Sequence, residues 1–193
     1  MANYISANRY LTAAEMETNA RWLYTYMTGR GWSPQAVCGM LGNMQYESNI
    51  NPGVWENLSS ADTSRGFGLV QWTPSTKYTE WCSDRALDPA TMEAAVARIE
   101  YEWVNGLQYY PTDSYPLSWH DFKTSTADPS YLAMCFLHNY ERPADQNQPH
   151  RGTAATAWYN LLKGSEGSGG SGSTTIKNKR MSVVLLYEAI RRR

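Results

Sequence analysis

Apolar residues recur at helical spacing along most of the first 163 residues, which predicts a mainly α-helical domain. The first helix is predicted at 12–28, because Thr12-Ala-Ala-Glu15 is a capping-box pattern and Gly29 and Gly31 end the segment. Its apolar stripe consists of Met16, Ala20, Leu23 and Met27.

Four later sites share one helix-start signal, an N-cap side chain directly before a proline that suits the first helical position. They are Ser33-Pro34, Thr73-Pro74, Asp88-Pro89 and Asp128-Pro129. The helices that follow are predicted to end near residues 48, 86, 105 and 141. A short helix could begin at Ser118, and a last one, opening at Gly152, would close the core.

The helix predicted after Pro89 carries a clear apolar stripe and a charged opposite side. The stripe consists of Met92, Val96, Ile99 and Trp103. Glu93, Arg98 and Glu102 are interpreted as the solvated face of this helix.

The composition changes after Lys163. Residues 164–173 are rich in Gly and Ser and are predicted to be a flexible linker, so that residues 1–163 form the domain. Residues 174–193 combine a basic start, an apolar run and three final arginines, and are too short to fold alone. This tail is interpreted as a docking segment or the start of a truncated second module, and contact with a membrane surface is the less favoured reading.

Composition and charge argue against a nucleic-acid-binding protein. Apolar residues make up 42% of the 193, which suffices for a proper core, and the formal net charge is -1. Residues 177–193 carry six Lys/Arg against one Glu, a local +5, which leaves -6 on the first 176 residues. An acidic domain binds phosphate backbones poorly, so we expect no nucleic-acid partner.

The termini and apolar runs give no targeting signal. No apolar segment approaches the roughly 20 residues that a membrane span needs, and the start of the chain lacks a signal-peptide pattern. The three cysteines, at positions 38, 82 and 135, are interpreted as buried free thiols, a single disulfide being the lesser alternative.

Glu47 is the strongest candidate for chemistry. Counted from Val37, the apolar positions Val37, Met40, Leu41 and Met44 fall on one helix face, and Glu47 lies at its edge. Partial burial disfavours the charged form, so we expect the pKa of this carboxyl to be raised. A carboxylate is also the wrong sign for the C-terminal end of a helix dipole, a cost of a few tenths of a kcal/mol that suggests a functional reason. Such a group can act as a proton donor near neutral pH.

The run Gly66-Phe-Gly-Leu-Val-Gln-Trp72 offers groups suited to a sugar. Its two glycines allow the backbone to approach a ligand closely, while Gln71 and Trp72 supply an amide and a ring. A small β-hairpin could form in this region by pairing of Val54-Trp55 with Phe67 to Trp72, beside the cleft expected at Glu47. The alternative is that Gln71 caps a strand end and Trp72 belongs to the core.

Three motifs together resemble the lysozyme-like superfamily, which contains goose-type lysozymes and soluble lytic transglycosylases. They are Glu47-Ser48 at a helix end, Gly-x-Gly-Leu-Val-Gln-Trp at 66–72, and Asn139-Tyr-Glu-Arg-Pro143. Residues 3–163 are most similar to one branch, the glycan-cleaving domain of tail-associated lysins from phages of Gram-positive hosts. The resemblance implies a helical fold that cleaves the β-1,4 bond between N-acetylmuramic acid and N-acetylglucosamine in peptidoglycan, at a tail tip, during DNA entry. It also implies other tail proteins as partners.

The resemblance makes Glu47 the general acid, and the second catalytic group stays open. Asp62 is the tentative choice, because its loop leads into the glycine run and could face Glu47, and Glu56 and Glu141 are the alternatives. For Glu141 an ion pair with Arg142 is the favoured interpretation. Many lytic transglycosylases need only one Glu, because the 6-hydroxyl of the substrate attacks; hydrolysis is favoured here.

The remaining site residues are substrate contacts, and no cofactor is expected. The substrate-binding candidates are Ser48, Ser64, Gln71, Trp72, Tyr140 and Glu141. His120, His138 and His150 are not in ligand spacing, so no metal is expected. The rival interpretation from another class is a cell-wall-binding or tail structural module that has lost turnover.

Overall fold

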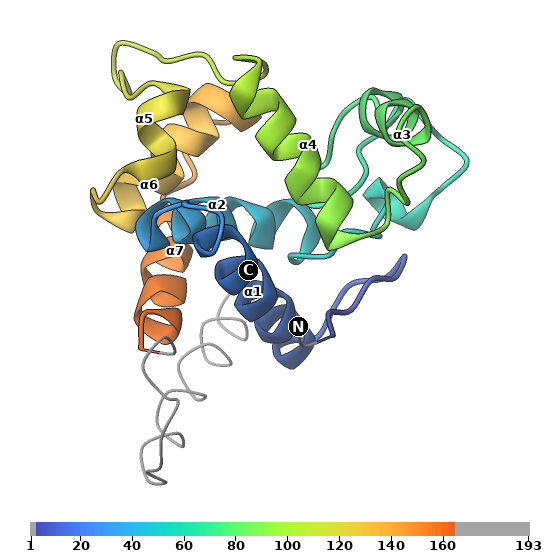
Figure 1. Ribbon diagram of the computed structural model, residues 1–193, viewed down its shortest axis with the longest axis horizontal. Helices are drawn as coiled ribbons and strands as arrows, with labels where there is room; N and C mark the ends of the chain where they lie inside the picture. The colour runs from blue at the N-terminus through green and yellow to red at the C-terminus, as the bar shows by residue number, and fades with distance from the viewer. Residues whose placement is uncertain (1–2, 165–193) are drawn as a thin grey trace, which may run out of the picture.

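The computed structural model describes residues 3–164, which fold into seven α-helices joined by turns (Figure 1). The prediction of a mainly α-helical domain is confirmed. The helices are α1 (Ala13–Thr28), α2 (Pro34–Ser48), α3 (Thr76–Ser83), α4 (Met92–Val104), α5 (Trp119–Thr124), α6 (Pro129–Phe136) and α7 (Pro149–Leu162). A short turn, η1 (Glu56–Leu58), precedes α3, and a π-helical turn, η2 (Leu137–Glu141), extends α6. The predicted linker after Gly164 and the tail at 174–193 lie outside the described residues.

Most helix starts follow the predicted capping signals. Thr12 caps α1 in a complete capping box, and Ser33, Ser118 and Asp128 cap α2, α5 and α6 through their side chains. The helix α7 begins at Pro149, three residues before the predicted start.

Two predicted helix starts are wrong. The Thr73 hydroxyl donates to the carbonyl of Gln71 instead of capping a helix, and α3 begins only at Thr76. The Asp88 side chain accepts from the amide of Ala90 in a local turn, so Thr91 becomes the N-cap of α4. A capping residue before proline therefore also suits a turn that precedes the helix.

The helix α2 is the buried centre of the fold. It packs most extensively against α7 and α6 and also against α1, with α4 on the side toward α3 (Figure 1). A Cβ atom at Gly42 would come within 2.4 Å of the Arg151 carbonyl oxygen, and one at Gly39 within 2.9 Å of the Leu132 Cβ. The two glycines thus permit the close approach of α7 and α6. This approach brings the first turn of α7 beside the C-terminal end of α2.

The charged face predicted for α4 is wrong for Glu102. Met92, Val96 and Ile99 are buried as predicted, but Glu102 is only 1% exposed. Its carboxylate accepts hydrogen bonds from groups in two other segments of the chain, which are described below.

The segment between α2 and α3 contains only a minimal version of the predicted hairpin. Isolated antiparallel bridges join Trp55 to Phe67 and Phe67 to Trp72. All three cysteines are buried free thiols, as predicted. No helix within residues 3–164 has the length and apolar character needed to cross a membrane.

Candidate active site

Glu47 lies in the last turn of α2 and forms an ion pair with Arg151 from the first turn of α7. The Arg151 Nη1 donates to Glu47 Oε1 at 2.6 Å. The side chain of Arg151 is 6% exposed and that of Glu47 is 20% exposed. Arg151 also donates to the Asn43 side chain and to Gln148, which fixes its guanidinium in place. The ionised form of Glu47 therefore has a rigidly held partner that the sequence analysis did not identify.

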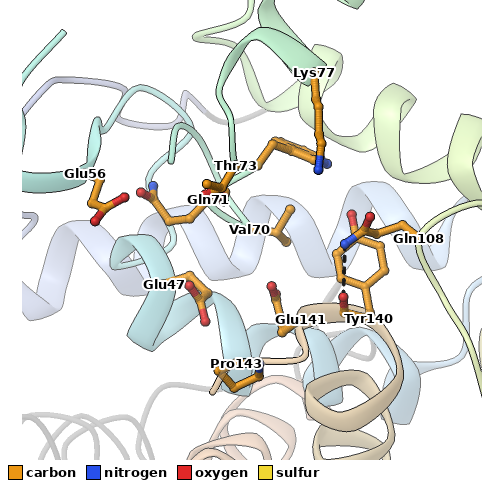
Figure 2. A pocket seen from close by; sticks show the side chains of 11 residues that line it. Glu47, Glu56, Val70, Gln71, Thr73, Lys77, Gln108, Tyr140, Glu141 and Pro143 are labelled. Atoms are coloured by element: carbon orange, nitrogen blue, oxygen red, sulfur yellow. Dashed lines mark hydrogen bonds between the residues drawn. The ribbon is translucent and has the colours of Figure 1, made fainter. Parts of the chain in front are cut away.

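A pocket of about 460 Å³ opens beside Glu47 (Figure 2). Side chains from α2, η1, α3, η2 and the loops between them surround it. The lining residues are Glu47, Glu56, Val70, Gln71, Trp72, Thr73, Lys77, Gln108, Tyr140, Glu141 and Pro143. The volume falls in the range of small-molecule sites in proteins. Of the sequence-predicted site residues, the pocket brings together Glu47, Gln71, Trp72, Tyr140 and Glu141.

Backbone geometry places Gln71 at the pocket. Its amide nitrogen donates to the carbonyls of Val54 (3.2 Å) and Gly68 (2.9 Å), so the side chain ties the bridged segment together. A Cβ atom at Gly66 would lie within 2.8 Å of Gln71 Oε1, and Gly68 has a φ of +83°. Both glycines are therefore needed for this arrangement. The side-chain oxygen of Gln71, Oε1, lines the pocket, accepts no hydrogen bond from residues 3–164 and remains available to a ligand.

Ser48 supports the pocket from behind. Its hydroxyl lies within hydrogen-bond distance of the carbonyls of Leu69 (2.8 Å) and Met44 (3.2 Å). It is buried and does not line the pocket. We therefore correct its predicted role: Ser48 joins the end of α2 to the glycine run instead of contacting a ligand.

Trp72 and Tyr140 are mainly core residues with one side at the pocket. Trp72 is 5% exposed and its ring stacks on Tyr78 at 4.1 Å, and Tyr140 is 1% exposed. The carboxylate of Glu102 accepts from Trp72 Nε1 (3.1 Å), from the Tyr140 hydroxyl and from Arg98 Nε (2.8 Å). This network fixes two walls of the pocket to α4. Burial raises the pKa of Glu102, and the hydrogen bond from Tyr140 and the charge of Arg98 oppose that rise.

Glu141 ends the π-helical turn η2 and faces the pocket near Glu47 (Figure 2). Its Oε1 is buried and has no hydrogen-bond partner within the described residues. The predicted ion pair with Arg142 does not form; the Arg142 guanidinium lies 4.6 Å from the ring centroid of Tyr110. Burial raises the pKa of Glu141 well above its ordinary value, and the negative charge of Glu47 adds to the rise.

The loop that contains Asp62 and Ser64 does not reach the pocket. The Ser64 hydroxyl donates to Asp62, and Arg65 Nε lies 3.1 Å from Asp62 Oδ2. The hydrogen bond from Ser64 is the main cause that lowers the pKa of Asp62. Neither residue lines the pocket, and Glu56 is the carboxylate that η1 contributes. Glu56 accepts from Arg65 Nη1 at 3.0 Å and from the amide of Gly66 at 2.9 Å.

Comparison with known proteins identifies the family of the chain. A model for phage tail lysozymes matches residues 18–162, a span that includes every helix that lines the pocket. The chain belongs to the phage tail lysozyme family. This phage tail lysozyme domain is also 46% identical over 166 residues to morphogenesis protein 1 of Bacillus phage B103. The match covers 86% of the chain but only 45% of that relative, so the chain spans less than half of its length.

Family membership shows a lysozyme-like domain of the phage tail type over residues 18–162. Within residues 3–164 no group of three or more His, Cys, Asp or Glu could hold a metal ion. The pocket residues that were not predicted from the sequence include Thr73, which was interpreted as a helix cap, and Lys77 and Gln108, which belong to no motif. Arg151 was not predicted from the sequence either, although a cation in the first turn of a helix is the wrong sign for that end of the helix dipole.

Glu141→Gln should stabilise the protein at pH 6.5 and have little effect near pH 4. Because burial raises the pKa of Glu141, the folded protein keeps a proton that the unfolded chain releases above its ordinary pKa of about 4.3. Stability is therefore lost as the pH rises, by about 1.4 kcal/mol per unit up to the pKa of the folded state. Glutamine carries no such cost. Urea unfolding of both proteins at pH 4.0, 5.5 and 6.5 measures the difference, and a constant difference across this range would contradict the prediction.

Proposed function

We propose that the domain cleaves the β-1,4 bond between N-acetylmuramic acid and N-acetylglucosamine in peptidoglycan, with Glu47 as the general acid. The observation that carries this proposal is the pocket itself, which joins Glu47 to Glu141, Gln71 and Trp72 from separate segments. Cleavage of a glycosidic bond needs a proton on the leaving oxygen and stabilisation of an oxocarbenium-like centre. Carboxyl groups in a partly dry pocket can supply both.

A second carboxylate in the pocket distinguishes hydrolysis from transglycosylation. Glu56 replaces Asp62 as the candidate water-activating base, because Glu56 lines the pocket and two hydrogen bonds to its carboxylate hold it there. In hydrolysis such a base would activate a water molecule on the face of the sugar opposite the acid. In transglycosylation the substrate's own 6-hydroxyl attacks, and no such base is required. The presence of Glu56 in the pocket favours hydrolysis.

Contacts to the sugar follow from the free groups of the pocket. The side-chain oxygen of Gln71 can accept from the amide of an N-acetyl group, while the side-chain nitrogen donates to two backbone carbonyls. The edges of Trp72 and Tyr140 that line the pocket would form an apolar wall against a sugar ring. Ser64 lies in the exposed loop and would contact only a longer glycan strand.

The family and the phage relative support a setting for this activity. We propose that the protein works at the tail tip of a virion of a phage that infects a Gram-positive host, and opens the wall for DNA entry. Other tail proteins would hold it there through residues 164–193. The rival function is binding to the wall without turnover, which would explain the pocket but requires no buried, unpaired carboxyl.

Digestion of purified Gram-positive walls, followed by mass spectrometry of the soluble products, tests the proposal. Muropeptides with reducing N-acetylmuramic acid ends are expected from hydrolysis, and anhydro ends would indicate transglycosylation. Glu56→Gln should lower the yield of reducing ends if Glu56 activates water. Binding of the protein to walls with no release of glycan fragments would support the rival function.

A further inference from the structure

Two carboxyl groups of the pocket differ sharply in their partners. Glu47 Oε1 receives a hydrogen bond from the buried guanidinium of Arg151. Glu141 Oε1 is buried with no partner in residues 3–164. An ionised carboxylate without a donor is costly in such a position, whereas a protonated carboxyl is tolerated. The geometry therefore separates the pair into one ionised and one neutral member.

Charged groups around Glu141 act in both directions. Glu47 lies close enough for its charge to disfavour a second negative charge on Glu141, and Arg151 partly offsets this effect. The titratable and charged groups that face Glu141 are Glu47 from α2, Arg151 from α7, Glu102 from α4, and the pocket residues Glu56 and Lys77. Glu102 and Glu56 are themselves acidic and engaged by Arg98 and Arg65. These surrounding charges together favour a state in which Glu47 and Glu141 carry a single proton as a pair.

A local backbone feature places Glu141 at this point. The helix α6 passes into the π-helical turn Leu137–Glu141, and Arg142 follows with a φ of +50°. Single π-helical turns occur often at functional sites, because the extra residue redirects side chains. The Asn139 side chain anchors the turn by donating to the Tyr115 carbonyl and to the Tyr109 hydroxyl. The turn is therefore built rigidly, and Glu141 is its last residue.

We propose that Glu141 is the proton-holding partner of Glu47: the two carboxyls share one proton, which resides on Glu141 in the empty pocket and is delivered through Glu47 during cleavage. This inference rests on the proposed function. Arg151 determines which of the two carboxyls holds the proton, because it donates a hydrogen bond to ionised Glu47 and none to Glu141.

The step conserves atoms and charge. The O–H bond of Glu141 breaks as an O–H bond forms on Glu47, directly or through one water molecule, and the negative charge moves to Glu141. Glu47 then protonates the glycosidic oxygen as the C1–O bond breaks, and the bonding electron pair stays on the leaving oxygen. Attack on C1 by water or by the 6-hydroxyl releases a proton; in hydrolysis Glu56 takes it first, and its return to Glu141 restores the neutral carboxyl.

Glu141→Gln tests the proposal through the pH profile of cleavage. Glutamine has the shape of the neutral carboxyl but cannot give up a proton, so Glu47 must take its proton from solvent against the charge of Arg151. We expect the initial rate of fragment release at pH 7 to fall at least 10-fold, and the alkaline limb of the profile to move at least one unit toward acid. Glu141→Asp should restore part of the rate. If Glu141 had only a structural role, the alkaline limb of the pH profile would stay at the same pH in this variant.

The controls separate this inference from the proposed function. If Glu47→Gln is inactive while folded Glu141→Gln keeps the rate and pH profile of the original protein, the proton-holding role is overturned and the function stands. If the original protein releases no fragments, the function fails first. Should Glu141→Gln not fold, a carboxyl ¹³C titration of the original protein decides. The carboxyl signal assigned to Glu141 should titrate above the ordinary range, and an ordinary value for that signal would overturn the proposal.

Discussion

Glu47→Gln is expected to lower the rate of glycan cleavage at least 100-fold, because general acid catalysis contributes about 10² to 10⁴-fold. Glutamine keeps the size of the side chain and can still accept from Arg151, but it cannot protonate a leaving oxygen. The rate of fragment release from purified walls at pH 5 to 7 measures the loss. Binding to insoluble walls should be retained, since the shape of the pocket is unchanged.

The control for this variant has to account for Arg151. Glutamine leaves the guanidinium, which is 6% exposed, without its counter-charge, so some loss of stability is expected. Circular dichroism should confirm that the variant is folded at the assay temperature. Glu17→Gln, which breaks an ion pair within α1 with Arg21, is the matched control and should keep full activity. If the activity of Glu47→Gln stayed within threefold of that of the original protein, Glu47 would not be the general acid.

The position of Glu47 could be predicted because it depends on local rules. A capped start at Ser33, a regular apolar pattern and a left-handed C-cap at Asn49 fix the helix, and Glu47 then falls at its end. The partner of Glu47 depends on tertiary packing of α7 against α2, which the periodicity of either helix does not contain. A signal was nevertheless present. Arg151 stands in the first turn of α7, the wrong sign for that end of the dipole, just as Glu47 does at the end of α2.

The second carboxyl could not be chosen from the sequence. Asp62, Glu56 and Glu141 were all plausible by residue type, and the choice depends on how loops fold between α2 and α3. The Ser64 hydroxyl and the Arg65 guanidinium engage Asp62 locally, and this contact keeps its loop away from the pocket. Glu141 was assigned a partner in the adjacent Arg142, but neighbours in sequence need not face each other, and the π-helical turn directs Glu141 inward.

Glu102 was misread because helical periodicity describes only one face of a helix. The helix α4 packs on two sides, with its apolar stripe in the core and Glu102 toward the wall of the pocket. A buried carboxylate is acceptable there because Arg98, Trp72 and Tyr140 all donate to it. The two distant donors, Trp72 and Tyr140, leave no mark in the local pattern of α4.

Glu102→Ala should therefore be the most destabilising single change discussed, with a loss of about 3–5 kcal/mol, as is typical when one partner of a buried ion pair is removed. Arg98 would lose its counter-charge, and Trp72 Nε1 and the Tyr140 hydroxyl would lose their acceptor. Urea unfolding at pH 7, monitored by circular dichroism, measures the change. Cleavage should also fall, because Trp72 and Tyr140 are walls of the pocket.

Glu100→Ala is the control for this experiment, since it removes the same charge from the same helix. The Glu100 carboxylate, 18% exposed, pairs with Arg30, 46% exposed, and accepts a long hydrogen bond from Trp32 Nε1 (3.4 Å); exposed ion pairs contribute about 0–1 kcal/mol. We expect the two variants to differ by at least 2 kcal/mol in the free energy of unfolding. Equal losses would mean that the Glu102 network adds no stability beyond a surface ion pair, and that packing alone holds the walls of the pocket in place.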